Sequence, residues 1–169
     1  MSDLAIHSLP IHARWSVRAA PENVTRVGEL LGTALPLQPM TSAEHDGVEA
    51  WWLGPDEWLV LVPADRAVQA RNRLRASGAP PFSAVDITDR HLALEIVGAG
   101  ASWVLNSGCP LDLGTSAFPP GTCTRTLLGK AEILLRRRVA DVETFHLECG
   151  RSFMPYVLNR LRAAADERT

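Results

Sequence analysis

Alternating apolar and polar residues mark the middle of the chain as the join between two structured halves. Over residues 90–96, aliphatic side chains alternate with polar or small ones, the period of two that is typical of a half-buried strand. Gly98 interrupts this pattern, and an almost wholly apolar run over residues 99–106 predicts a short buried helix that stops before Pro110. The stretch 84–113 therefore predicts a strand, a tight turn and a buried helix.

The same reasoning predicts the elements on either side of this stretch. In the first half, the patterns indicate a strand over 14–19, a helix over 21–31, a loop over 33–46, a hairpin over 48–62 and a helix over 65–77. In the second half, they indicate a loop over 114–121, strands over 122–128, 132–139 and 144–149, and a last helix that begins near residue 152. We expect residues 1–12 to form a flexible arm and residues 163–169 to fray.

An internal repeat relates the two halves. The hairpin turn that begins at Gly54 matches the turn that begins at Gly129, an offset of 129 − 54 = 75, and Arg14 matches Arg90 at an offset of 90 − 14 = 76. In each half, the predicted elements follow the order strand, helix, strand, strand, helix. The sequence thus predicts an α+β fold of two ferredoxin-like units side by side. These units cover residues 13–88 and 89–165 of one compact domain, between the arm at 1–12 and a tail at 166–169.

Composition narrows the class of protein. Hydrophobic residues make up 46% of the 169, the formal net charge is −2 and the sequence pI is about 6.2. These values give no electrostatic footprint for nucleic acid or an anionic membrane, and no apolar run approaches the roughly 20 residues that span a bilayer. We therefore expect a cytoplasmic protein that binds neither nucleic acid nor membrane.

Catalytic and metal-binding motifs are weak throughout. Gly98 and Gly100 stand between a strand and a helix as in a dinucleotide-binding loop, but Trp103 occupies the third glycine position, so a tight turn is the better interpretation. Cys109 has no base placed beside it, and the three cysteines and five histidines show no metal-ligand spacing. His146 falls on the polar side of its strand, where we expect solvent. No catalytic residue, metal or bound cofactor is predicted for this chain.

Two polar groups are candidates for ligand or partner contacts. Asp86 and Thr88 share one side of a strand and could hold a ligand, although turn and cap chemistry explains them equally well. The run Arg136, Arg137 and Arg138 ends a strand, where it favours either a solvated edge or contact with an acidic partner.

Tryptophan is unusually frequent, with five residues. Trp51 and Trp52 are adjacent in a predicted strand, so they point to opposite faces of the sheet. One can enter the core, while the other faces outward unless something covers it. Aromatic exposure of this kind is typical of protein interfaces, and we predict a buried partner surface at this pair.

A series of short motifs, in order and spacing, resembles the gamma subunit family of heterotetrameric sarcosine oxidase. The resemblance covers about the C-terminal half and extends more weakly into the hairpin at 52–58. The motifs are Val85-Asp86-Ile87-Thr88-Asp89-Arg90, Gly98-Ala99-Gly100-Ala101, Leu105, Gly108-Cys109-Pro110-Leu111-Asp112-Leu113, Phe118-Pro119-Pro120-Gly121, Thr126, Phe145 and Arg151-Ser152-Phe153. Trp103 departs from this pattern, because it is bulkier than the residue expected in that helix.

The resemblance implies a fold similar to part of the folate-binding aminomethyltransferases of glycine cleavage. It also implies assembly with alpha, beta and delta subunits that carry FAD, FMN, NAD, tetrahydrofolate and zinc. Such a complex demethylates sarcosine to glycine and passes the one-carbon unit to tetrahydrofolate. Since the family places no catalytic residue on the gamma subunit, the implied role is structural.

Two alternatives remain open at this point. One is a free-standing folate-binding or one-carbon-transfer protein, which the implied fold also allows. The other keeps the gamma-type role in a complex that acts on a different N-methylated amine.

Overall fold

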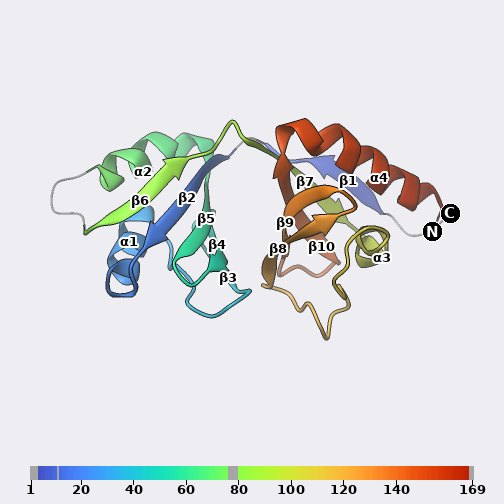
Figure 1. Ribbon diagram of the computed structural model, residues 1–169, viewed down its shortest axis with the longest axis horizontal. Coiled ribbons are helices and arrows are strands. Elements are labelled where there is room, and N and C mark those ends of the chain that lie inside the picture. Colours follow the sequence, from blue (N-terminus) through green and yellow to red (C-terminus); the bar gives the residue numbers. More distant parts are fainter. Residues whose placement is uncertain (1–3, 11, 76–79, 168–169) are drawn as a thin grey trace. The chain divides into compact units, whose positions relative to one another are not determined.

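The computed structural model describes residues 4–10, 12–75 and 80–167, which form two units (Figure 1). The inserted unit comprises Ile11–Thr88, and the terminal unit combines Met1–Pro10 with Asp89–Thr169. Each unit contains a five-stranded antiparallel sheet with helices packed on one face. This architecture confirms the predicted α+β class. The two units divide after Thr88.

The inserted unit follows the predicted ferredoxin-like chain order, with one additional edge strand. Its sheet has the order β3-β4-β5-β2-β6. The elements are β2 (Ala13–Ala19), η1 (Pro21–Asn23), α1 (Val24–Leu31), β3 (Ser42–His45), β4 (Val48–Gly54), β5 (Glu57–Val62), η2 (Ala64–Arg66), α2 (Ala67–Leu74) and β6 (Phe82–Asp86). Strand β3 lies in the segment expected to be a loop, and residues 76–79 of the predicted second helix lie outside the described residues.

The terminal unit differs from that order in two of its strands. Its sheet has the order β1-β7-β10-β9-β8, so β10 lies between β7 and β9 while β1 forms an edge. The elements are β1 (Ala5–Ser8), β7 (His91–Val97), α3 (Ala101–Asn106), β8 (Cys123–Leu128), β9 (Ala131–Arg137), β10 (Thr144–Gly150), η3 (Arg151–Phe153) and α4 (Met154–Glu167). Both predicted hairpins are present, each with a two-residue turn.

Each core forms where strand alternation meets helix periodicity. In the inserted unit, Trp15 and Val17 of β2 point toward Val27 and Leu31 of α1 in one buried cluster. In the terminal unit, Leu94 and Ile96 of β7 join residues of β9, β10, α3 and α4 in a second cluster. The opposite side is polar on β2 and β10, whereas on β5 it carries Leu59 and Leu61, which are buried outside the cluster of the inserted unit.

The expectation of a flexible arm over residues 1–12 is wrong for its described central part. Ala5–Ser8 form β1, which pairs antiparallel with β7 from Ala5 opposite Val97 to Ser8 opposite Leu94. Leu4 and Ile6 also pack against the terminal core. Edge pairing and apolar burial together offset the entropy of ordering this segment. Residues 1–3 and 11 lie outside the described residues.

Two further expectations need correction. The tail predicted to fray from residue 163 instead continues α4 to Glu167, because Ala164 is buried against the terminal core. Helix α3 is buried only on one side: Val104 and Leu105 are inaccessible, whereas the side chain of Trp103 is 49% exposed. The bulk of this indole therefore does not enter the packing between helix and sheet.

Candidate functional sites

Asp86 and Thr88 are engaged in local contacts at the end of β6. Asp86 Oδ1 accepts a hydrogen bond from the Thr88 backbone N–H at 3.0 Å, and Oδ2 accepts one from Arg71 Nη2 at 2.6 Å. Thr88 Oγ1 accepts a bond from the backbone N–H of Arg14 at 3.0 Å. Hydrogen bonding with Thr88, followed by the bond and charge of Arg71, lowers the pKa of Asp86 below its ordinary value. This geometry is that of a turn tied to α2.

The two adjacent tryptophans occupy different environments. Trp51 is fully buried, and its Nε1 donates to Glu49 Oε2 at 2.9 Å. Trp52 is partly buried and packs against the core of the inserted unit. Burial removes the exposure on which the prediction of an interface at Trp51 depended, because a covered indole presents no surface to a partner. Trp52 keeps some exposure and remains a predicted interface residue.

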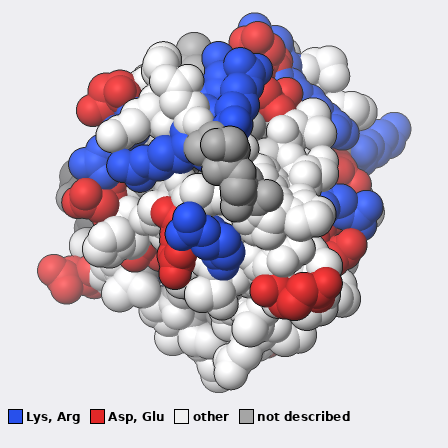
Figure 2. All heavy atoms as spheres, turned by 90° about the vertical axis from the view of Figure 1, so that its left-hand side faces the viewer, with Lys and Arg blue, Asp and Glu red and all other residues white. Residues whose placement is uncertain are grey.

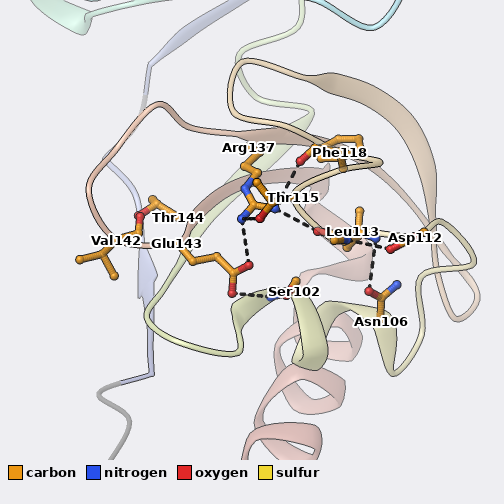
Figure 3. A network of polar contacts seen from close by, with 11 residues as sticks. Ser102, Asn106, Asp112, Leu113, Thr115, Phe118, Arg137, Val142, Glu143 and Thr144 are labelled. Carbon is orange, nitrogen blue, oxygen red and sulfur yellow. Dashed lines mark hydrogen bonds and ion pairs between the residues drawn. The ribbon is translucent and has the colours of Figure 1, made fainter.

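Arg137 lies inside the terminal unit, where it links β9 to two loops (Figure 3). Its Nη1 donates to the backbone oxygens of Leu113 at 3.0 Å and Phe118 at 3.3 Å. Its Nη2 donates to Thr115 Oγ1 at 2.9 Å and Glu143 Oε1 at 3.1 Å, and only 7% of the arginine side chain is exposed. Glu143 also accepts the backbone N–H of Ser102 at the start of α3. The guanidinium thus stabilises the fold of the terminal unit through these internal hydrogen bonds.

Arg136 and Arg138 point to the other face of the same sheet. Arg136 is only 4% exposed, so neither it nor Arg137 forms the solvated edge that the sequence suggested. Arg138 Nε approaches Glu95 Oε1 at 3.5 Å, and its Nη2 lies 3.2 Å from His146 Nδ1. With 27% of its side chain exposed, Arg138 alone of the three retains access to solvent and remains an interface candidate.

His146, expected in solvent, instead forms a buried pair with Glu148. His146 Nε2 lies 3.0 Å from Glu148 Oε1, and the two side chains are 1% and 0% exposed. An imidazole oriented by a carboxylate is a familiar acid-base arrangement. Here the second ring nitrogen faces Arg138. With Arg138 beside the other ring nitrogen and almost no exposed surface, the pair has the geometry of a structural contact.

The cysteines are poorly suited to nucleophilic chemistry. All three are buried thiols that form no disulfide among the described residues. Burial, reinforced by the charge of Glu148, raises the pKa of the Cys149 thiol to about 11. Among the described residues, no group of three His, Cys, Asp or Glu side chains could hold a metal ion. Within the same residues, every helix is too short or too polar to cross a bilayer.

One hollow of about 570 Å³ opens beside the start of α4 in the terminal unit. Arg90 and Arg151 lie on its rim with Glu132, and the ring of Phe153, 45% exposed, forms part of its wall. Arg151 Nη2 lies 3.8 Å from Asp89 Oδ1, so the two side chains form a loose ion pair. An apolar wall beside two exposed guanidinium groups suits a protein partner better than reaction chemistry.

A second hollow of about 430 Å³ lies against α2 in the inserted unit. Leu31, Val48 and Val62 form its floor, while Arg66 and Arg73 stand on its rim. Sequence reasoning singled out neither hollow, because both combine residues from separate strands and helices. The arginines of α2 and the motif around Phe153 were visible in the sequence, but their position around a hollow was not.

Comparison with known proteins identifies the family. The sarcosine oxidase, gamma subunit family matches residues 16–167. Sarcosine oxidase subunit gamma of Corynebacterium sp. (strain P-1) is 34% identical over 124 residues, and that of Arthrobacter sp is 33% identical over 124 residues. Each match covers 72% of this chain and 61% of the relative. The chain thus spans less than two thirds of the length of these relatives.

Solved structures show the same fold. A chain of heterotetrameric sarcosine oxidase from Corynebacterium sp. U-96 superposes with a TM-score of 0.84 at 23% identity, over 97% of this chain and 84% of that one. Glycine cleavage system aminomethyltransferase T from Bartonella henselae superposes with a TM-score of 0.67 at 12% identity, over 94% of this chain and 45% of that one. Both confirm the aminomethyltransferase-like fold. Together with the match over residues 16–167, they lead to one conclusion: the chain belongs to the sarcosine oxidase gamma subunit family.

Proposed function

We propose that this chain is the gamma subunit of a heterotetrameric sarcosine oxidase and serves it as a structural subunit without catalytic residues. The observation that carries this proposal is the family match over residues 16–167, which spans both units. The fold shared with a chain of heterotetrameric sarcosine oxidase supports it. So does the use of Asp86, Thr88 and Arg137 in internal contacts, since these groups stabilise the chain and are not presented to a substrate.

The complex we propose has alpha, beta and delta subunits beside this one. They carry FAD, FMN, NAD, tetrahydrofolate and zinc, convert sarcosine to glycine and pass the one-carbon unit to tetrahydrofolate. We expect the assembly in the cytoplasm. On this chain, the partner surfaces include the partly exposed Trp52 and Arg138.

The test is co-expression of this chain with the flavin-bearing and folate-type subunits of a heterotetrameric sarcosine oxidase. We expect one assembly that contains this chain, absorbs light as a flavoprotein and consumes oxygen when given sarcosine. Omitting this chain should reduce the yield of the full assembly, whereas the isolated chain should not oxidise sarcosine. Full-size, fully active complex formed without this chain would contradict the proposal.

The folate-binding alternative rests on the similarity to aminomethyltransferase T. Titration of the isolated chain with tetrahydrofolate separates the two functions. Saturable binding that is weakened by Asp86→Asn would favour the alternative. We expect no saturable binding, because the Asp86 carboxylate is held by Arg71 and Thr88. A panel of N-methylated amines given to the assembled complex tests whether sarcosine is the substrate.

A further inference from the structure

Helix α2 and the two residues that flank it carry four arginines, only two of which have a carboxylate partner among the described residues. We call Arg66, Arg71, Arg73 and Arg75 the α2 arginine surface. Arg66 Nη1 contacts Asp46 Oδ2 at 3.0 Å, and Arg71 Nη2 contacts Asp86 Oδ2 at 2.6 Å. Arg73 and Arg75 are exposed and contact no carboxylate among the described residues. Figure 2 looks onto this end of the inserted unit, where Lys and Arg side chains lie among Asp and Glu side chains.

The side chains of α2 bury little of their surface against the rest of the unit. Of its eight residues only Ala70 is fully buried, and Val68 is 67% exposed. No acidic residue lies between Ala67 and Leu74, so no ion pair within the helix balances the arginines. Arg71 and Arg75 are four positions apart, where like charges repel. The helix dipole stabilises cations in the last turn of a helix. That effect explains neither Arg66, which precedes α2, nor the exposure of Val68.

The hollow beside α2 adds a concave site to the positive charge of this surface. Leu31, Val48 and Val62 form an apolar floor, and Arg73 stands at the rim. The Arg73 guanidinium lies close to Gly32, since a Cβ there would be 3.8 Å from Arg73 Nη1, an ordinary van der Waals distance. The volume of about 430 Å³ is enough to admit a carboxylate side chain with its aliphatic stem on the floor.

We propose that the α2 arginine surface docks an acidic segment of a partner subunit. One carboxylate of that segment binds Arg73 at the hollow, a second binds Arg75, and an apolar side chain covers Val68. This inference rests on the proposed function, because it requires a complex in which this chain is a subunit.

A protein partner fits better than a nucleic acid or a membrane. Two of the four arginines already have carboxylate partners, Asp46 and Asp86. Only Arg73 and Arg75 remain for a ligand. A phosphate backbone or an anionic bilayer is held by many cations acting together, whereas two guanidinium groups at the end of one short helix, one of them lining a hollow, suit a short acidic segment.

The experiment measures recombination of this purified chain with the remaining subunits at low and high salt. The variant Arg73→Glu/Arg75→Glu should bind at least about tenfold more weakly, and much of the salt dependence seen with the unaltered chain should disappear. Arg73→Lys/Arg75→Lys keeps the charge and should bind with an intermediate affinity. Arg26→Glu is the matched control, because Arg26 is an exposed α1 arginine that pairs only locally with Glu29 at 2.7 Å; it should bind normally. Circular dichroism checks that each variant is folded.

The outcomes separate this inference from the proposed function. If the unaltered chain assembles and the double Glu variant assembles equally well, the docking surface is wrong while the subunit role stands. If the unaltered chain fails to assemble, the proposed function and the docking surface fail together. Retention of the chain on anionic vesicles or a DNA oligonucleotide, lost in the double Glu variant without any loss of assembly, would also overturn the inference in favour of another partner.

Discussion

The guanidinium of Arg137 lies over the ring of Phe145, 5.2 Å from its centroid. The same group bonds to the loop oxygens of Leu113 and Phe118 and to the carboxylate of Glu143. One cation thereby joins β9 and β10 to the loop that follows α3. An arginine that satisfies two carbonyls and one carboxylate in a water-poor site is costly to remove, because its partners stay behind without a donor.

Arg137→Met should therefore lower the free energy of unfolding by about 3 kcal/mol, since it leaves a largely buried carboxylate and two carbonyls unpaired. Urea denaturation of the full chain measures this loss. Arg26→Met is the control: its partner Glu29 is 57% exposed, and we expect a change below about 0.5 kcal/mol. A loss below about 1 kcal/mol for Arg137→Met would show that the loops hold their positions without it.

Strand β1 should contribute to stability through one side chain only. Ile6 packs against the terminal core, whereas the adjacent His7 is exposed. Ile6→Ala should cost about 1–2 kcal/mol because it leaves a partial cavity, and His7→Ala should be neutral within about 0.5 kcal/mol. Thermal unfolding of both variants checks this difference. If both variants changed the stability equally and negligibly, residues 4–8 would be a loosely held arm that contributes nothing to stability.

Asp86 should give a small stability contribution that depends on pH. Its folded-state pKa is lowered, so the contribution is present above the unfolded pKa near 3.8 and is lost as pH falls through the still lower folded value. The side chain is 41% exposed and screened by solvent, so we expect Asp86→Asn to cost less than about 1 kcal/mol at pH 7. Comparing urea midpoints from pH 7 to pH 3, the gap between the two proteins should close below pH 4. A gap that is constant across this range would disprove the carboxylate's role.

Gly129 and Gly121 form a matched pair for separating backbone strain from crowding. Both have left-handed backbone, with φ of 60° and 90°. A Cβ at Gly121 would meet nothing within 4 Å, whereas one at Gly129 would collide with the hydroxyl of Tyr156. Gly121→Ala should cost about 1 kcal/mol, and Gly129→Ala at least about 1 kcal/mol more, because it also displaces the Tyr156 acceptor of the Lys130 N–H. Equal losses in calorimetry would mean that Tyr156 moves aside freely.

Much of the fold was predictable because alternation and helical spacing report directly on burial. The central strand emerged as β7 (His91–Val97), and both hairpins lie where their turns were expected. Strand β1 was missed because four residues carry too short a pattern. The position of β10 between β7 and β9 is a long-range pairing, which local sequence does not encode.

The candidate sites were harder to predict. A charged side chain is normally expected to be exposed, whereas several charged side chains of this chain are buried. Arg137 shares its face of β9 with Ile133 and Leu135, both in the core, so the period of two already directed it inward. The three consecutive arginines obscured this signal. The His146–Glu148 pair shows the opposite case, because nothing in its own strand reveals that this polar face is covered.

The pairing of β1 with β7 also has a consequence for synthesis on the ribosome. Ile6 meets Ile96, and the whole inserted unit is made between them. At about 5–20 residues per second, β1 waits on the order of 5–20 s for its partner strand. The inserted unit, by contrast, is complete in sequence once residue 88 has emerged. We therefore expect it to fold first, while the first strand of the chain stays unpaired and open to chaperones until the second half appears.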